Sequence, residues 1–147
     1  MIYAKHFAPL TNIGFMTNSK WGFTIGYSPD GLVGDDGLVE CKSRRQKFQV
    51  QTILENLIDD QGETIPPEYM MQLQTGLLVS ERQWIDFVSY SGGLPFVRIR
   101  VYPNAAVQDA IVNVAGEFER RLAKRLWQYQ AAVKDMIPTE RKEVVYI

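Results

Sequence analysis

Apolar positions in the first part of the chain alternate at short range, which is typical of strands. Residues 1–20 give a weak pattern that predicts one or two short strands. Residues 21–27 (WGFTIGY) are rich in aromatic and β-branched side chains and predict another strand. A Ser-Pro-Asp-Gly turn follows at 28–31. Residues 32–42 then place two apolar stretches around an acidic turn at 34–37, and this pattern predicts a hairpin.

The middle of the chain has helical spacing. Residues 44–58 predict a helix from the apolar positions Phe48, Ile53, Leu54, Leu57 and Ile58. A polar break covers residues 59–67. Pro67 suits the first turn of a second helix, which we expect to run to about residue 79, because a first-turn proline loses no helical hydrogen bond.

Two further strands and one long helix complete the pattern. Residues 84–90 and 96–102 predict a strand pair joined by a Ser-Gly-Gly turn. In the second strand, Val97, Ile99 and Val101 alternate with Arg98 and Arg100, so we expect a sheet with one solvated face. Asn104 is a candidate N-cap for a helix to about residue 134, with the apolar stripe Val107, Ile111, Val114, Phe118, Leu122, Leu126 and Tyr129.

This order of elements predicts one mixed α/β domain over residues 1–147, in which residues 135–147 form a loosely attached tail. A chain of 147 residues, 46% hydrophobic and 22% charged, suits one globular core. We find no apolar run of membrane-spanning length and no signal peptide, and therefore expect a cytoplasmic protein.

The net charge and the numbers of cysteine and histidine residues limit which kinds of site the chain can form. One cysteine and one histidine exclude an internal disulfide, a multi-cysteine zinc site and a histidine-based metal cluster. The net charge of −1 excludes a uniformly basic DNA-coating protein. It is compatible with a nuclease, in which carboxylates that hold metal offset basic residues that hold phosphate.

The most informative residues are Asp30, Glu40 and Lys42. Asp30 follows a predicted strand, and Glu40 and Lys42 are two residues apart on another, so their side chains share a face. Magnesium prefers oxygen ligands, which Asp30, Glu40 and the carbonyl of Cys41 would supply. Lys42 would orient the attacking water and stabilise developing negative charge. The Cys41 thiol should point to the opposite face as a small core group rather than a nucleophile.

Each feature also has an ordinary structural interpretation. A Pro-Asp-Gly triplet is usually only a turn, and a Glu-x-Lys strand is usually a solvated face. Tyr69 and Gln72 lie three apart on one predicted helical face, and Gln72 would bond water, phosphate or Lys42. An exposed helix face with Tyr69 half buried explains the same spacing.

Three segments together resemble a known family. Ser28-Pro29-Asp30-Gly31, Glu40-Cys41-Lys42 and Tyr69-Met-x-Gln72-x-Gln74 are similar, in order and spacing, to the lambda-type phage exonucleases (YqaJ-like viral recombinases) of the PD-(D/E)xK superfamily. The resemblance covers roughly residues 21–129. It implies a restriction-endonuclease-like core, with a mixed central β-sheet flanked by helices.

The resemblance also implies an activity. Members are magnesium-dependent exonucleases that digest one strand of linear double-stranded DNA from 5′ to 3′, and Mn²⁺ can substitute for Mg²⁺. Family partners are duplex DNA ends and a single-strand annealing protein, and members form trimers. It implies metal binding by Asp30, Glu40 and the Cys41 carbonyl, with Lys42 and Gln72 as the remaining catalytic residues. It also suggests a phage or prophage protein of a bacterial host cell.

Four residues are candidate DNA contacts, namely Arg44, Arg45, Tyr69 and Gln74. A solvated helix start is an equal explanation for the arginines. The basic run Arg120, Arg121, Lys124 and Arg125 favours a solvated helix face, with phosphate contact as the minor alternative. His6 is best explained as a surface or core histidine.

One departure from the family leaves three functions open. Members have an N-terminal helical region that adds another acid to the metal site. Here 29 residues precede Asp30 and none is Asp or Glu. The alternatives to an active exonuclease are therefore a truncated, non-catalytic core that binds DNA or a partner chain, and an endonuclease of the same superfamily.

Overall fold

A four-stranded mixed sheet lies at the centre of the computed structural model, which describes residues 2–58 and 65–140. Its strands, in spatial order, are β3 (Gly31–Val33), β4 (Gly37–Ser43), β5 (Trp84–Tyr90) and β6 (Val97–Val101). The two central strands, β4 and β5, run parallel, and each edge strand is antiparallel to its neighbour. The predicted hairpin, strand pair and mixed α/β architecture are therefore confirmed.

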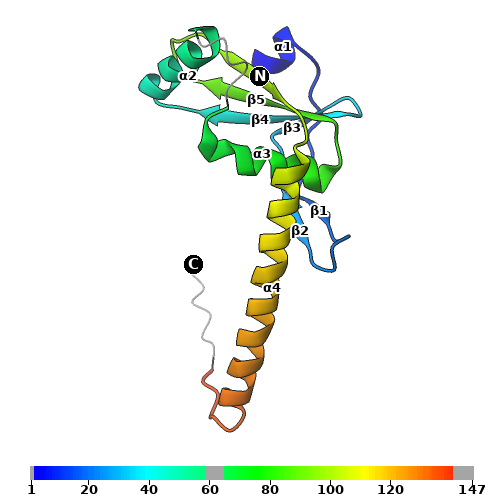
Figure 1. Cartoon of the computed structure of the whole chain (residues 1–147). Coiled ribbons are helices and arrows are strands. Elements are labelled where there is room, and N and C mark those ends of the chain that lie inside the picture. The colour runs from blue at the N-terminus through cyan, green and yellow to red at the C-terminus, as the bar shows by residue number, and fades with distance from the viewer. Residues whose placement is uncertain (1, 59–64, 141–147) are drawn as a thin grey trace.

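Helices cover the two faces of this sheet unequally (Figure 1). Helix α3 (Pro67–Ser80) lies across one face, and the larger apolar core forms between them. That core contains Tyr27, Leu38, Ile65, Leu73, Leu77, Val79, Ile85, Phe87, Ile99 and Val101. The short helix α1 (Ile2–His6) lies over the other face, where Tyr3, Val33, Val39 and Val88 are buried.

Helix α2 (Gln46–Ile58) follows β4 directly and is fixed by one buried side chain. The amide of Gln49 donates to the backbone oxygens of Ser89 and Pro95, and the Ser89 hydroxyl donates back to the Gln49 side-chain oxygen at 2.5 Å. Because Gln49 is fully buried, these bonds satisfy polar groups that water cannot reach. They hold α2 against the end of β5.

The N-terminal part of the chain differs from the expectation. Residues 2–6 form the helix α1, which was not predicted; one short strand lies within residues 1–20, as expected, and the predicted strand over 21–27 is reduced to β2 (Ile25–Tyr27). Strand β2 pairs with β1 (Met16–Asn18) in a separate two-stranded sheet. A turn occupies the start of the predicted strand, so β2 begins only at Ile25: the Gly22 N–H donates to the Ser19 carbonyl and Gly22 adopts a φ of +83°, which favours glycine.

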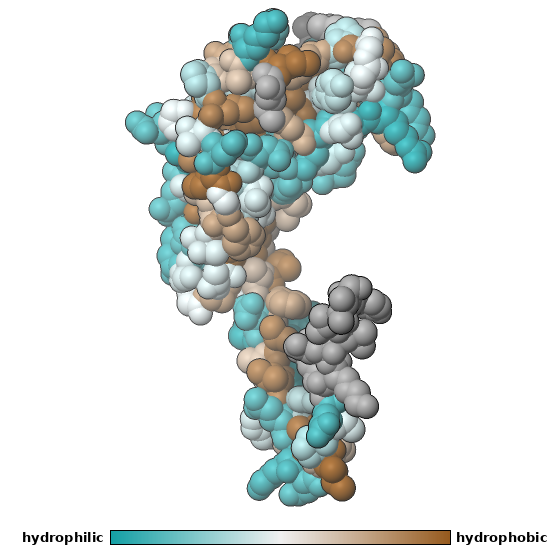
Figure 2. Space-filling model, turned by 180° about the vertical axis from the view of Figure 1, so that it is seen from behind, coloured by the Kyte–Doolittle hydropathy of each residue, from teal (hydrophilic) through white to brown (hydrophobic). Residues whose placement is uncertain are grey.

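The last helix, α4 (Ala105–Val133), has 29 residues and projects from the body, as Figure 1 shows. Asn104 caps its start, as predicted, by accepting from the Val107 N–H at 3.1 Å. The helix has no buried residue. Apolar side chains along the projecting part are exposed (Figure 2), including Phe118, Leu122, Leu126, Trp127 and Tyr129. The predicted stripe is present, but its outer part does not pack on the described body.

Two expectations on connecting segments fall partly outside the described residues. These are the polar break, of which residues 59–64 are not described, and the tail, of which residues 141–147 are not described. Residues 135–140 are exposed and follow the end of α4 without regular structure, apart from a turn. No helix within the described ranges combines the length and apolarity that a membrane crossing requires.

A buried carboxylate, that of Asp86 on β5, ties α1 to the sheet. The Tyr3 hydroxyl donates to its Oδ2 at 2.6 Å, and the Arg100 guanidinium donates to both oxygens at 2.8 and 3.0 Å. Arg100 also lies 3.5 Å from the centre of the Trp84 ring. The sheet face that carries Arg98 and Arg100 was expected to be solvated. It is instead partly covered by α1.

We expect Asp86→Ala to destabilise the fold. The change leaves Tyr3 and Arg100 without the acceptor around which they are arranged, and removing one partner of such a pair costs about 3 kcal/mol. Urea denaturation measures the effect. Asp35→Ala, at an exposed acid in the β3–β4 turn, is the control and should change the free energy of unfolding by less than about 0.5 kcal/mol. Equal effects of the two variants would contradict this account.

Candidate active site

The Ser-Pro-Asp-Gly turn places Asp30 directly beside β4. The Asp30 N–H donates to the Val39 carbonyl at 3.1 Å, and its carboxylate Oδ2 accepts from the Cys41 N–H at 2.6 Å. Two hydrogen bonds therefore hold the turn against the strand that carries Glu40 and Lys42. Asp30 itself is exposed, so its carboxylate lies at the mouth of the site.

Glu40 lies deeper, and three donors converge on its carboxylate. It is only 3% exposed. Its Oε1 accepts from the Gln72 amide at 2.6 Å and from the Lys42 ammonium, and its Oε2 accepts from the Tyr27 hydroxyl at 2.5 Å. A buried carboxylate needs such partners because it has lost its hydration. The predicted common face of Glu40 and Lys42 is confirmed, and Gln72 contacts Glu40 rather than Lys42.

Aromatic and basic side chains surround this group on the side of α3. The Lys42 ammonium lies 5.6 Å from the centre of the Tyr69 ring, and the Arg44 guanidinium lies 5.5 Å from the same ring. Tyr69 also packs on Phe87 of the core at 5.2 Å between ring centres. The Tyr69 ring therefore lies between Phe87 of the core and the cationic groups of Lys42 and Arg44. Tyr69 and Gln72 both contact residues of this site, which is consistent with their predicted shared helical face.

The electrostatics of the site keep its neutral groups protonated. Burial, and then the hydrogen bond to Glu40, raise the pKa of Tyr27 well above its ordinary value, so the phenol remains a donor. Burial, followed by the charges of Asp30 and Glu40, raises the pKa of the Cys41 thiol to about 11. The thiol points to the opposite face, against the cluster around Val39 and Val88, as expected. It is therefore not a nucleophile at neutral pH.

The oxygen donors fit a hard divalent cation. Asp30 and Glu40 supply two carboxylates, and within residues 2–58 and 65–140 the second oxygen of Asp30 accepts no hydrogen bond. No group of three His, Cys, Asp or Glu side chains that could hold a metal occurs in these ranges. Magnesium commonly binds through one or two carboxylates and retains several waters, so two acids are sufficient to hold it.

The four predicted DNA contacts are not all placed together. Tyr69 and Arg44 border the site, and the Arg44 side chain is fixed by the Thr52 hydroxyl at 2.5 Å. Arg45 is exposed beside them at the start of α2. Gln74 is buried on another side of α3.

Gln74 holds the start of α4. Its amide donates to the Tyr102 carbonyl at 2.9 Å, and its oxygen accepts from the Asn104 N–H at 2.8 Å. The structure therefore assigns Gln74 to the β6–α4 junction rather than to a DNA surface.

Tyr27 is the residue that sequence analysis missed. It was predicted only as the end of a strand, and thirteen residues separate it from Glu40. The only available signal was its place directly before the Ser-Pro-Asp-Gly turn, at which the chain crosses from β2 to the central sheet. Such a position does not indicate which side chain the hydroxyl will meet.

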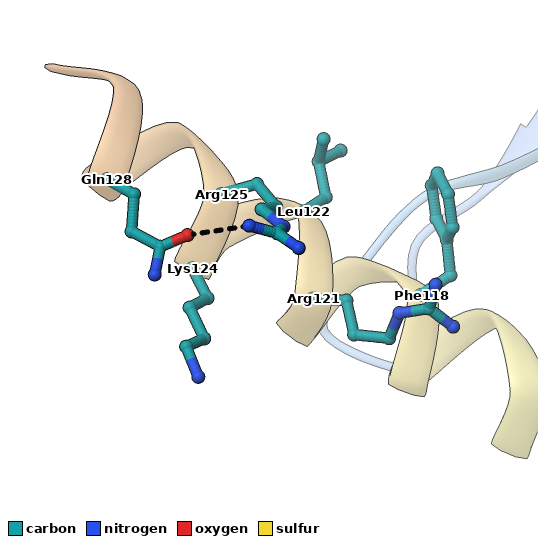
Figure 3. A pocket seen from close by; sticks show the side chains of 6 residues that line it. All are labelled: Phe118, Arg121, Leu122, Lys124, Arg125 and Gln128. Atoms are coloured by element: carbon teal, nitrogen blue, oxygen red, sulfur yellow. Dashed lines mark hydrogen bonds between the residues drawn. The ribbon is translucent and has the colours of Figure 1, made fainter. Parts of the chain in front are cut away.

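A pocket lies on α4, and none of the candidate active-site residues described above lines it (Figure 3). Its described lining consists of Phe118, Arg121, Leu122, Lys124, Arg125 and Gln128, all from one helix. The lining offers cations and apolar groups but no carboxylate, so it does not hold a metal. The basic run lies on a solvated face, as expected, because Arg120, Arg121, Lys124 and Arg125 are all exposed.

Comparisons with known proteins identify a family and similar solved structures. The profile of the YqaJ-like viral recombinase domain matches residues 3–83. One similar structure is that of LHK-Exo, an alkaline exonuclease from Laribacter hongkongensis, solved in complex with dAMP. Its sequence is 27% identical to this chain and the TM-score is 0.79; the match covers 92% of this chain and 68% of LHK-Exo. A second structure of LHK-Exo is 29% identical to this chain with a TM-score of 0.61, and the match covers 85% of this chain and 68% of that one. No curated protein gives a significant sequence match.

We expect Gln72→Ala to lower the free energy of unfolding by about 1.5 kcal/mol, because it removes a half-buried hydrogen bond to a charged group. Gln51→Ala is the matched control, since Gln51 donates to Glu55 at the same 2.6 Å but in solvent. Its effect should stay below about 0.5 kcal/mol. Chemical denaturation of both variants gives the comparison, and an equally mild Gln72→Ala would show that Glu40 does not need this donor.

Proposed function

The chain belongs to the family of YqaJ-like viral recombinase domains, and from this membership we propose that it is the core of a magnesium-dependent DNA exonuclease. We propose further that it digests one strand of linear duplex DNA from 5′ to 3′. The observation that supports the proposal best is that Lys42 and Gln72 both donate to the Glu40 carboxylate, while Asp30 accepts from the N–H of Cys41, the residue between Glu40 and Lys42. The likeness to an alkaline exonuclease supports DNA as the substrate.

In the proposed reaction, the oxygen of a water molecule forms a bond to a phosphorus atom, the bond from phosphorus to the leaving oxygen breaks, and the proton that the water loses ends on the leaving oxygen, which departs as a hydroxyl group. A magnesium ion held by Asp30, Glu40 and the Cys41 carbonyl would supply Lewis-acid activation of that water, and manganese would substitute. Lys42 lies at the same carboxylate with its ammonium partly exposed, and would hold the water and stabilise charge on the phosphate. Gln72 fixes the Glu40 oxygen that Lys42 shares.

The DNA strand would approach from the side of Asp30, the exposed member of the group. Tyr69 borders the site and Arg45 is exposed at the start of α2, so we propose these two as contacts to the DNA backbone. The Arg44 side chain, expected as a third contact, is 5% exposed and bonded to Thr52, so we propose that it supports Tyr69 instead. Residues 1–147 then act as one nuclease core with a tail at 135–147. A homo-oligomer, trimeric by resemblance, and a single-strand annealing partner belong to the same proposal, as does action in a bacterial host cytoplasm.

Two alternatives use the same residues. The two-carboxylate site favours a core that binds DNA without cutting it, if a further acid is essential. An endonuclease would use Asp30, Glu40 and Lys42 unchanged, because the trio serves both modes of cleavage. The DNA substrate used in the assay therefore has to distinguish an exonuclease, an endonuclease and a non-catalytic DNA-binding core.

We expect the purified chain with Mg²⁺ to release label from 5′-labelled linear duplex DNA and to leave closed circular DNA intact. Asp30→Ala should abolish the reaction and Lys42→Ala should slow it about 100-fold or more, by loss of a ligand and of charge stabilisation. Asp35→Ala, an exposed acid in the β3–β4 turn, should retain the activity. Chelation of the metal should stop cleavage, and added Mg²⁺ should restore it.

Other outcomes separate the alternatives. Cleavage of the circle would indicate an endonuclease. Salt-dependent DNA binding without cleavage would indicate a non-catalytic core. Activity that survives unchanged in Lys42→Ala would remove the proposed site altogether.

A further inference from the structure

The three donors on Glu40 differ in which oxygen they use. Lys42 and Gln72 share Oε1, whereas Oε2 accepts the Tyr27 hydroxyl at 2.5 Å. Tyr27 reaches the carboxylate from outside the central sheet, because it ends β2 of the separate two-stranded sheet. It is the donor on Glu40 that comes from neither β4 nor α3.

The Tyr27 ring is held rigidly. The residue is 6% exposed, and its ring packs against α3 where Gly76 leaves no side chain. A Cβ added at Gly76 would lie 2.7 Å from Cε1 and Cζ of the ring, far inside contact distance. The ring therefore fills the space that the glycine leaves, and its hydroxyl has little freedom to turn away from Glu40.

We propose that Tyr27 is a positioning residue, which holds the Glu40 carboxylate in the orientation needed to bind a divalent cation together with Asp30. The inference rests on the proposed function, since it assigns a purpose to a contact of that site. Hydrogen bonds to a ligand carboxylate orient it before the metal arrives, and their loss typically weakens metal binding about 10- to 100-fold. Glu40 needs such orientation because its carboxylate is buried and Asp30 approaches from another segment.

If Tyr27 only stabilised the fold, its loss would not change metal binding. The hydrogen bond between Tyr3 and Asp86 serves as the comparison for such a structural role. On the other face of the sheet, the buried Tyr3 hydroxyl donates to the buried Asp86 carboxylate at 2.6 Å. Tyr3→Phe and Tyr27→Phe thus delete the same kind of bond in the same protein. Only the second deletion touches a proposed metal ligand.

The experiment is a titration of Mn²⁺ and Mg²⁺ into the full-length chain by calorimetry, for the wild type, Tyr27→Phe and Tyr3→Phe. Asp30→Asn identifies the heat that belongs to the site. We expect Tyr27→Phe to raise the metal dissociation constant about 10-fold or more. Tyr3→Phe should leave the constant unchanged, although thermal unfolding should show that both variants are less stable.

Nuclease assays over a range of Mg²⁺ give a second readout. The half-saturating Mg²⁺ concentration of Tyr27→Phe should rise by a similar factor, while the rate at saturating Mg²⁺ should return to within a few-fold of the wild type. A structural lesion would instead lower the rate at every metal concentration. Should Tyr27→Phe fail to fold, Gly76→Ala takes its place, since the added Cβ forces the ring from its position and should weaken metal binding likewise.

The results test the positioning role of Tyr27 separately from the proposed nuclease function. Wild-type metal affinity in Tyr27→Phe, or an equal loss of affinity in Tyr3→Phe, would overturn the positioning role and leave the nuclease proposal standing. Absence of metal binding by the wild type would overturn the proposed metal site itself, and the inference with it.

Discussion

The buried carboxylate of Glu40 is a constraint that the packing of the surrounding elements has to satisfy. A charge that is 3% exposed is stable only if donors from the protein replace its lost water. Those donors come from β2, β4 and α3, so the packing of α3 on the sheet and the crossing from β2 to the central sheet must both place a polar group at one point. The same requirement explains the close approach of Tyr27 to Gly76, because a bulkier residue there would displace the ring and its hydroxyl.

The sheet contains a second buried carboxylate, and the comparison shows why only one forms a candidate site. Asp86 accepts from Arg100 on both oxygens and from Tyr3, under the cover of α1. Its charge is matched by a guanidinium, which holds the carboxylate in a fixed geometry. Glu40 is paired with the ammonium of Lys42, whose side chain is 22% exposed, and with the neutral amide of Gln72. The Asp86 carboxylate is thus paired with a guanidinium under α1, whereas Glu40 is paired with Lys42 on the strand that Asp30 binds.

Much of this protein followed from local pattern in the sequence. Strand-forming residues in 84–90, alternation in 97–101, and helical spacing in 44–58 and 107–129 predicted strands and helices that the structure contains, since these patterns depend on backbone geometry within a segment. The spacing of Glu40 and Lys42 fixed their common face for the same reason. The pattern did not predict α1 at residues 2–6, which is held by the contact of Tyr3 with Asp86, 83 residues later in the chain.

The candidate site shows the same division. The sequence determined which residue types were available for chemistry, namely Asp30, Glu40, Lys42 and Gln72, because their motifs are short and local. Only the tertiary structure decided that Tyr27 joins them and that Gln74 serves the junction with α4 instead. Both outcomes depend on how α3 sits against the sheet, and that placement comes from packing of the shared apolar core, which no single segment encodes.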